Sequence, residues 1–246
     1  MPISPLFSSV LTQEWTVSFL QCYPNGMMKH TDLCNVLQLT AALHAELGGI
    51  SFTDMQVHQQ AWVLSRMRVE ITELPKWRDV IQVKTWIHSL ENSRSIRCLE
   101  VYLGTKKIVG CETFWAVFNT NSRRPESLAL PYDHFELYPE RATVEPFRRI
   151  ELPALMDVVG QHTVLLSDLD IVNHANSVKY LEWCLDAAPI DVVLQQRIAS
   201  IEMNYLKEVS WQDTVALHLE TTPHLLTYSL QRESKVCFAL QLALHP

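Results

Sequence analysis

Apolar residues recur along the first half of the chain with two different periods. In residues 14–19 they alternate with polar residues, a spacing typical of a strand. In residues 30–49 they recur three and four positions apart and end at Gly48 and Gly49, which predicts a long helix with a glycine stop. Further strand-like runs follow at 62–71, 79–87, 95–103 and 112–119. The first half is therefore predicted to be a strand, a long helix and about four antiparallel strands.

The second half follows the same order of patterns. Residues 162–167 predict a strand, and residues 176–188 predict a helix that ends before Pro189. The strand-like runs after this helix are 199–209, 213–220, 225–232 and 235–244. Two halves with one layout indicate an internal repeat.

Two local similarities set the halves in register. Residues 73–83 align with 207–217, and residues 29–39 align with 173–183. The first alignment places Leu74 at the position of Glu208. The second places His30 at the position of His174 and Gly26 at that of Asp170. We therefore expect the first half to lack counterparts of the acidic residues Asp170 and Glu208.

The repeat predicts an α+β fold in which each long helix is wrapped by a curled antiparallel sheet. We expect one repeat at 8–140 and the other at 150–246, separated by the charged, proline-containing segment 138–153. Two such units side by side can share one continuous sheet, which protects their edge strands from pairing with other chains.

Composition excludes several classes of protein. The chain has a formal net charge of −7 and lacks a cluster of basic residues interleaved with aromatic ones, so we expect no nucleic-acid partner. Six cysteines without regular spacing favour neither a zinc site nor a disulfide framework. We expect no membrane span, because no apolar stretch approaches the roughly 20 residues needed. The first residues lack the pattern of a signal peptide, so we expect a cytoplasmic protein.

Polar residues gather at the start of the predicted second helix. The sequence "DLDIVNHANSVKYLEWCLDAA" begins at Asp168 and becomes apolar at helical spacing after residue 177. One interpretation is a capped helix start, with Asp168 or Asp170 as the N-cap. The other is a catalytic cluster, and the rest of the chain must decide between them.

Three segments together resemble the acyl-acyl-carrier-protein thioesterases of plant plastids and bacteria. They are "AWVLSRMRVEITELPKWRDVIQVKTWI", "FWAVFNTNSRRP" and "DLDIVNHANSVKYLEW", and the resemblance extends from about Glu14 to the last strand. It implies a tandem (double) hot-dog fold, with an acyl-chain pocket in a catalytically empty first repeat and catalysis in the second. It also implies a partner, acyl-carrier protein bearing a phosphopantetheine-linked acyl chain. No plant transit peptide is evident, which suits a bacterial enzyme.

The resemblance also implies site residues. The family motif Asp-x-Asn-x-His-x-Asn falls on Asp170, His174 and Asn176, and the glutamate that follows the helix falls on Glu208. The chain departs from the motif at two positions. Val172 stands where the motif has its first asparagine, with Asn173 displaced by one, and Val209 stands where plant members have a cysteine.

These residue types suit the hydrolysis of a thioester, which needs a base or nucleophile and donors for the developing oxyanion. If the turn before the helix is helical, Asp170 and His174 face the same way, four residues apart. Glu208 would then position a water molecule. Free N–H groups at the start of a helix over 174–188 would face the oxyanion. Asn173 and Asn176 are supporting residues, and we expect no cofactor and no metal.

Two alternatives to an acyl-carrier-protein thioesterase remain open. One is an acyl-CoA thioesterase of the same fold, distinguished by the carrier that the protein turns over. The other is a non-catalytic acyl-binding protein whose site decayed at Val172, distinguished by acyl binding without turnover. The sequence leaves open the acyl chain length and whether the protein is a monomer or a homodimer.

Overall fold

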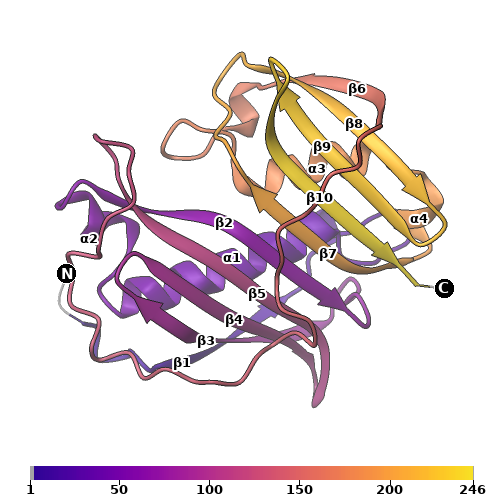
Figure 1. Cartoon of the computed structure of the whole chain (residues 1–246). Coiled ribbons are helices and arrows are strands. Elements are labelled where there is room, and N and C mark those ends of the chain that lie inside the picture. Colours follow the sequence, from indigo (N-terminus) through magenta and orange to yellow (C-terminus); the bar gives the residue numbers. More distant parts are fainter. Residues whose placement is uncertain (1–2, 246) are drawn as a thin grey trace.

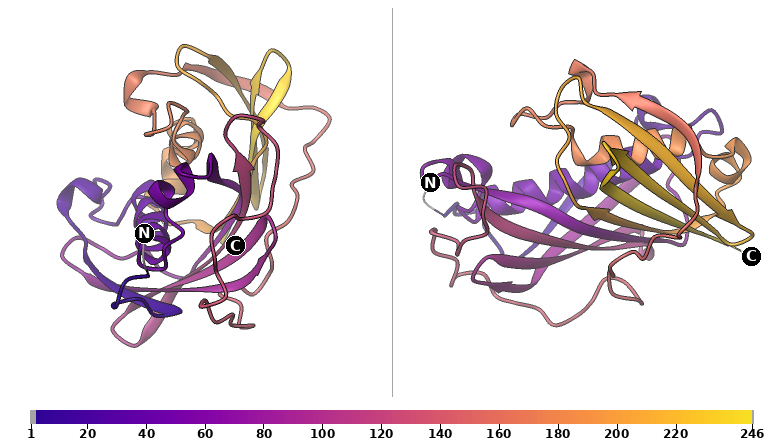
Figure 2. Two further views of the ribbon diagram at one scale, coloured as in Figure 1. Left: turned by 90° about the vertical axis from the view of Figure 1, so that its left-hand side faces the viewer. Right: turned by 45° about the horizontal axis from the view of Figure 1, so that its top comes forward.

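A single curled antiparallel sheet of ten strands wraps two helices in the computed structural model, which describes residues 3–245 (Figure 1). Pro246, the last residue of the predicted second repeat, lies outside the described residues. The strand order is β1-β3-β4-β5-β2-β7-β10-β9-β8-β6, so strands of the first half occupy one side of the sheet and strands of the second half the other. Figure 2 shows the sheet curving around the helices. The predicted α+β class and the continuous sheet are confirmed.

Both halves have the same order of elements. The first contains β1 (Val10–Thr16), α1 (His30–Leu47), α2 (Phe52–Gln56), β2 (Gln60–Ile71), β3 (Val80–Glu91), β4 (Arg94–Leu103) and β5 (Lys106–Asn119). The second contains β6 (Asp157–Thr163), α3 (Ser177–Asp186), α4 (Ile190–Leu194), β7 (Ile198–Tyr205), β8 (Thr214–Thr222), β9 (Leu225–Arg232) and β10 (Lys235–Leu244). None of the helices in the described part of the chain is long and apolar enough to cross a membrane.

The first strand of each half ends earlier than the sequence predicts. Residues 14–19 and 162–167 were expected to be strands, but β1 ends at Thr16 and β6 ends at Thr163. A single 3₁₀ turn follows each strand, at Phe19–Gln21 and at Leu166–Asp168. Phe19 and Leu166 are 67% and 79% exposed. The apolar residues that predicted each strand therefore continue into a turn, where the side chains of Phe19 and Leu166 face outward.

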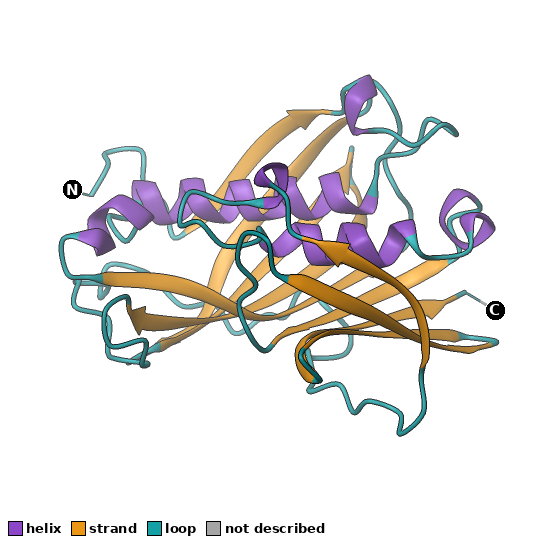
Figure 3. Cartoon of the chain, turned by 90° about the horizontal axis from the view of Figure 1, so that it is seen from above, coloured by secondary structure: helices purple, strands orange, loops and turns teal. Residues whose placement is uncertain are grey.

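The two halves join where β2 pairs with β7. The pairing is antiparallel and runs from Arg66 opposite Asn204 to Glu70 opposite Ser200. On the concave face of the sheet α1 and α3 lie side by side (Figure 3), and the hydroxyl of Ser177 donates to the side-chain carbonyl of Gln38 at 3.0 Å. One hydrophobic cluster includes residues of both helices and both halves of the sheet. The halves therefore share a core.

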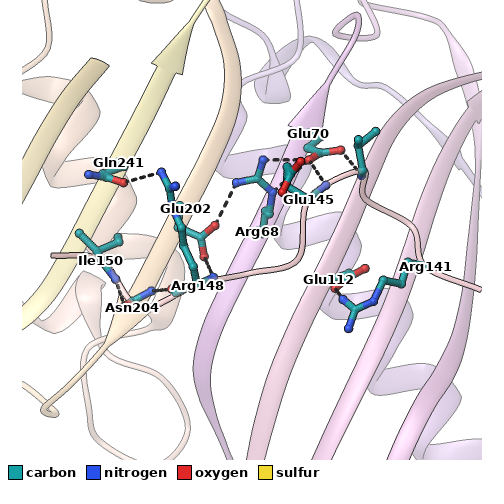
Figure 4. Close-up of polar contacts among 11 residues, drawn as sticks. Arg68, Glu70, Glu112, Arg141, Glu145, Arg148, Ile150, Glu202, Asn204 and Gln241 are labelled. Atoms are coloured by element: carbon teal, nitrogen blue, oxygen red, sulfur yellow. Dashed lines mark hydrogen bonds and ion pairs between the residues drawn. The ribbon is translucent and has the colours of Figure 1, made fainter. Parts of the chain in front are cut away.

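The segment between the halves crosses the opposite face of the sheet as a strap (Figure 4). We call residues 138–153 the strap. Its backbone N–H groups at Val144 and Glu145 donate to Glu70, and the N–H of Arg148 donates to Glu202 at 3.0 Å. Polar side chains on the outward face of β2 and β7 thus hold the strap across the seam. The sequence identified this segment only as a boundary between the repeats.

Arg68 connects the two halves beneath the strap. Its guanidinium lies 2.8 Å from the carboxylate of Glu70 on its own strand and 3.1 Å from that of Glu202 on β7. Glu202 is 2% exposed. Burial raises the pKa of Glu202, while the N–H of Arg148 and the side chain of Arg68 act in the opposite direction. A buried carboxylate of this kind depends on its partners, because an unpaired buried charge is strongly destabilising.

Candidate active site

Asp170 and His174 lie in a tight turn. The N–H of Asp170 donates to the carbonyl of His174 at 2.8 Å, which closes the segment as a hairpin-like loop. The carboxylate Oδ1 of Asp170 accepts the backbone N–H groups of Val172 at 3.0 Å and His174 at 3.1 Å. The helical geometry considered for this pair is therefore wrong. The short aspartate side chain instead organises the loop that presents the imidazole, as Asp does in Asx turns.

The helix after this loop begins later than predicted. The apolar pattern predicted a helix over 176–188, and the account of the oxyanion placed its start at residue 174, but α3 starts at Ser177. Asn176 is its N-cap, and its side-chain oxygen accepts the N–H of Val178 at 2.9 Å. The N–H of Asn176 donates to the carbonyl of Asp168 at 2.8 Å. The structure thus gives Asn176 a bracing role and identifies the N-cap as Asn176, in place of Asp168 or Asp170.

Asn173 occupies a backbone conformation that few residues adopt. Its φ angle is +65°, in the left-handed region where asparagine is enriched among non-glycine residues. Its N–H donates to the carbonyl of Asp170 at 3.1 Å, and its side chain is exposed. The structure therefore places Asn173 at the apex of the loop.

The loops that follow the first strand of each half correct the register of the repeat. Isolated bridges join Cys22 to Met28 in the first half and Leu169 to Ala175 in the second. Bridges also join Met27 to Lys76 and His174 to Ser210. Met27 is thus the counterpart of His174, and the alignment of His30 with His174 was wrong by three residues. The strands β1 and β6 end at Thr16 and Thr163, and the helices α1 and α3 begin at His30 and Ser177, so His30 corresponds to Ser177, the first residue of α3.

The corrected register assigns the other positions of the loop. The counterpart of Asp170 is Tyr23, and Gly26 corresponds to Asn173. Gly26 has a φ angle of +80°, so the left-handed apex is common to both loops. His30 was aligned with His174. Its Nδ1 instead shares a hydrogen bond with the hydroxyl of Tyr23, at 3.1 Å.

Glu208 reaches His174 from a separate segment of the chain. It lies just after β7, and its Oε2 is 3.5 Å from Nε2 of His174. The bridge between His174 and Ser210 and the hydrogen bond from the N–H of Ala175 to the carbonyl of Val209, at 2.9 Å, hold the two segments together. The side chains of His174 and Glu208 are 25% and 36% exposed, so both reach solvent.

A third group at this site comes from the first half and was missed by sequence reasoning. The guanidinium of Arg123 forms an ion pair with the same Oε2 of Glu208. Arg123 follows β5, in a turn where its N–H donates to the carbonyl of Asn119 at 2.9 Å. Its segment, "FWAVFNTNSRRP", was one of those that carried the family resemblance. Sequence distance hid the contact, because 85 residues separate the partners by number (208 less 123).

Burial and charge favour a neutral imidazole at this site. Partial burial lowers the pKa of His174, the positive charge of Arg123 lowers it further, and the carboxylate of Asp170 raises it. The net direction is downward, because desolvation and a nearby cation both disfavour the imidazolium. A neutral imidazole can accept a proton or orient a water molecule at neutral pH.

Asp168 has a different environment from Asp170. It is 4% exposed, and its Oδ2 accepts the N–H of Leu165 at 2.8 Å and contacts Nε2 of His162 at 2.9 Å. Burial raises the pKa of Asp168, but these hydrogen bonds and the charge of Lys179 outweigh it, so the net direction is downward. Asp168 thus supports the turn before the loop that carries Asp170 and His174.

No thiol described near the site is suited to nucleophilic attack, because Cys184 is buried and a valine stands at position 209. Cys184 on α3 is fully buried, and burial raises its pKa well above the usual value for a thiol. Val209, next to Glu208, is also fully buried. Within residues 3–245, no three His, Cys, Asp or Glu side chains form a group that could hold a metal ion.

Two family models match the chain in succession. The acyl-ACP thioesterase N-terminal domain matches residues 8–133, and the acyl-ACP thioesterase C-terminal domain matches residues 156–243. This chain belongs to the acyl-ACP thioesterase family. The resemblance inferred from the three segments is confirmed.

Plant members of the family are similar in sequence. A chloroplastic palmitoyl-acyl carrier protein thioesterase of Gossypium hirsutum is 29% identical over 229 residues, which are 86% of this chain and 55% of the relative. A chloroplastic oleoyl-acyl carrier protein thioesterase of Coriandrum sativum is 26% identical over 220 residues, 80% of this chain and 59% of the relative. The chain thus spans little more than half the length of these plant relatives.

Solved structures of the family share the fold. An acyl-ACP thioesterase from Bacteroides thetaiotaomicron is 25% identical with a TM-score of 0.89, covering 96% of this chain and 98% of that one. The 12:0-ACP thioesterase from Umbellularia californica has a TM-score of 0.84 at 18% identity, covering 98% of this chain and 99% of the other. The predicted double hot-dog fold is confirmed.

Proposed function

We propose that this chain hydrolyses the thioester of fatty acyl-acyl-carrier protein and releases a free fatty acid. The observation that carries the proposal is the contact between Nε2 of His174, on the loop organised by Asp170, and Oε2 of Glu208, 3.5 Å away on the segment after β7. These three residues stand at the motif positions of the acyl-ACP thioesterase family, and they come from two segments that only the fold brings together. The partner is acyl-carrier protein bearing a phosphopantetheine-linked acyl chain.

The site residues divide the chemistry among them. Water adds to the thioester carbonyl, its proton passes to a base, and the departing sulfur leaves as the C–S bond breaks. Neutral His174 and the Glu208 carboxylate suit the activation and orientation of that water. Asp170 uses one carboxylate oxygen for the loop and has a second for the water or the substrate. Asn173 and Asn176 support the loop from its apex and from the helix N-cap.

We also propose that the first repeat, residues 8–140, holds the acyl chain and that the second, residues 150–246, carries out the hydrolysis. Met67 on β2 lies in the shared core, fully buried beneath the helices. Met67→Ala should lengthen the space for the chain and shift preference towards longer acyl groups. Leu226→Ala on β9 is the matched truncation in the second repeat. If the chain-length preference changes only in the Leu226 variant, the pocket lies in the second repeat and this proposal is wrong.

An assay of fatty-acid release tests the main proposal. The purified chain is incubated with acyl-carrier protein loaded with acyl groups of graded length, and with the same acyl groups on CoA. We expect free fatty acid from the carrier protein without added metal or nucleotide. Release from CoA alone would favour an acyl-CoA thioesterase, and binding without release would favour an acyl-binding protein. Loss of activity to a chelator, restored by zinc, would contradict the roles given to the carboxylates and imidazole.

Cellular location and assembly stay predictions. We expect a cytoplasmic enzyme that is a monomer or a homodimer. Fractionation of the producing cell and light scattering of the purified chain test these two expectations.

A further inference from the structure

Arg123 brings a positive charge from the first repeat to the proposed catalytic residues of the second. Its guanidinium pairs with Oε2 of Glu208, the oxygen that lies 3.5 Å from Nε2 of His174. A single carboxylate oxygen therefore faces both a guanidinium and an imidazole. Because Arg123 is 57% exposed and Glu208 is 36% exposed, the pair contributes little to stability. Its position beside His174 suggests a different role.

The turn that carries Arg123 is well braced. The side-chain oxygen of Asn119 accepts the N–H groups of Asn121 at 3.0 Å and Ser122 at 2.8 Å. The N–H of Thr120 donates to the carbonyl of Gln59 at 2.7 Å, which ties the turn to the chain just before β2. Arg123 itself has a φ angle of +57°, an uncommon conformation for a residue with a side chain. The base of the arginine side chain is thus placed by a defined backbone.

We propose that Arg123 is a positioning residue that holds the Glu208 carboxylate against His174 in the working enzyme. This inference rests on the proposed hydrolytic function of the same site. A glutamate that is one-third exposed has many rotamers available, and the guanidinium restricts them to those that face the imidazole. The first repeat, which we expected to be catalytically empty, therefore contributes one residue to the organisation of the site.

Charged groups reach His174 from three directions. Asp170 faces it from its own loop, Glu208 from the segment after β7, and Arg123 from the turn after β5. Removing Arg123 removes the one positive charge among these three groups. The pKa of His174 should then rise, because Arg123 lowers it and only burial would be left to oppose the carboxylate of Asp170.

Kinetics of Arg123 variants test the proposal. Arg123→Gln should lower kcat by about 10- to 100-fold, the scale expected when a catalytic group is misplaced by about 1 Å. Its KM for acyl-carrier protein should stay close to that of the parent, and the acid limb of its pH profile should move to higher pH. Arg123→Lys keeps the charge and should restore part of kcat and the original limb. Arg124→Gln is the matched control, because it removes an equal charge from the neighbouring exposed residue.

A double-variant cycle tests whether Arg123 acts through Glu208. In a Glu208→Gln background, Arg123→Gln should cause almost no further loss of kcat. An equal loss in both backgrounds would overturn the proposal. A rise in KM with unchanged kcat and pH profile would also overturn it, and would assign Arg123 to binding the carrier.

A measurement without turnover separates this inference from the proposed function. The C2 proton of His174 is assigned by NMR through its loss in His174→Gln, and its titration is compared in the parent and in Arg123→Gln. We expect a higher pKa in the variant even if no substrate is hydrolysed. An unchanged titration would overturn the proposal, whereas absence of hydrolysis in the parent would overturn only the proposed function.

Discussion

The Oδ1 atom of Asp170 accepts the backbone N–H of His174 at 3.1 Å, so the carboxylate organises the loop that carries the imidazole. The same carboxylate brings a negative charge close to the ring. Asp170 can therefore act through its shape, through its charge, or through both. Substitutions that separate these roles are informative.

Asp170→Asn should keep the loop and lose the charge, because an amide oxygen accepts the same N–H groups. We expect Asp170→Asn, Asp170→Ala and His174→Ala each to lower turnover by about 10²- to 10⁴-fold, the usual contribution of an acid–base group. Only Asp170→Ala should also loosen the loop, seen as faster amide exchange at Val172 and His174. Cys184→Ala is the control, and its activity per folded molecule should match the parent. An inactive Cys184→Ala variant would revive a thiol nucleophile.

Asn173 tests whether the loop needs a conformation or an amide. Glycine adopts a φ angle of +65° freely, whereas alanine there costs about 1–2 kcal/mol. We therefore expect Asn173→Gly to retain most of the initial rate and Asn173→Ala to lower it. If both variants lose activity severely, the side-chain amide itself serves Asp170, in place of the motif asparagine absent at Val172. Val172→Asn should raise turnover only if no other residue has taken over the role of the motif asparagine.

Glu202 is expected to stabilise the seam between the repeats. Glu202→Ala leaves Arg68 and the N–H of Arg148 without this buried partner, and we expect a loss of about 3–5 kcal/mol in the free energy of unfolding. Urea unfolding followed by circular dichroism measures it. Glu73→Ala, which removes an exposed ion pair with Lys106, should cost less than about 1 kcal/mol. Equal costs for the two variants would mean that the seam does not depend on Glu202.

His30 should make the fold sensitive to acid. Burial lowers the pKa of His30 to about 4 in the folded protein, below its ordinary value of 6.5. Between these values the unfolded chain binds a proton that the folded chain does not, so stability falls as pH decreases from about 6.5 to about 4.

The variant His30→Gln removes this effect. Urea unfolding at several pH values should show a shallower dependence than in the parent, by up to about 1.4 kcal/mol per pH unit. His58→Gln, at an exposed position, serves as the control and should keep the slope of the parent. Parallel slopes for the parent and His30→Gln would show that His30 does not titrate on unfolding.

Most strands were predictable because their patterns are local. The last two, at 225–232 and 235–244, were predicted with the bounds that the structure shows for β9 and β10. Errors arose where a local pattern continued past the end of an element. Phe19, the first residue of the turn Phe19–Gln21, continues the alternation of the strand before it, and the start of α3 depends on the cap at Asn176. Backbone hydrogen bonds, which periodicity does not encode, decide such boundaries.

The candidate site was predictable in its residue types and only partly in its geometry. The motif placed Asp170, His174 and Glu208 together by resemblance, but a helical spacing between the first two was wrong. Their turn depends on hydrogen bonds to Oδ1 of Asp170 and on the left-handed conformation of Asn173. These features need the pairing of the loop with Val209 and Ser210, which lie far along the chain.

The sequence by itself determined the repeated order of elements, the apolar faces that form the core, and the residue types of the candidate site. These properties follow from local periodicity and from short motifs. The tertiary structure decided which residues of the two repeats meet. Pairing of β2 with β7 creates the seam that buries Glu202 beside Arg68, and the turn after β5 brings Arg123 to Glu208. Contacts between distant segments form only when the sheet closes. In the local sequence, each residue of such an ion pair is an ordinary charged residue, so the sequence does not reveal its partner.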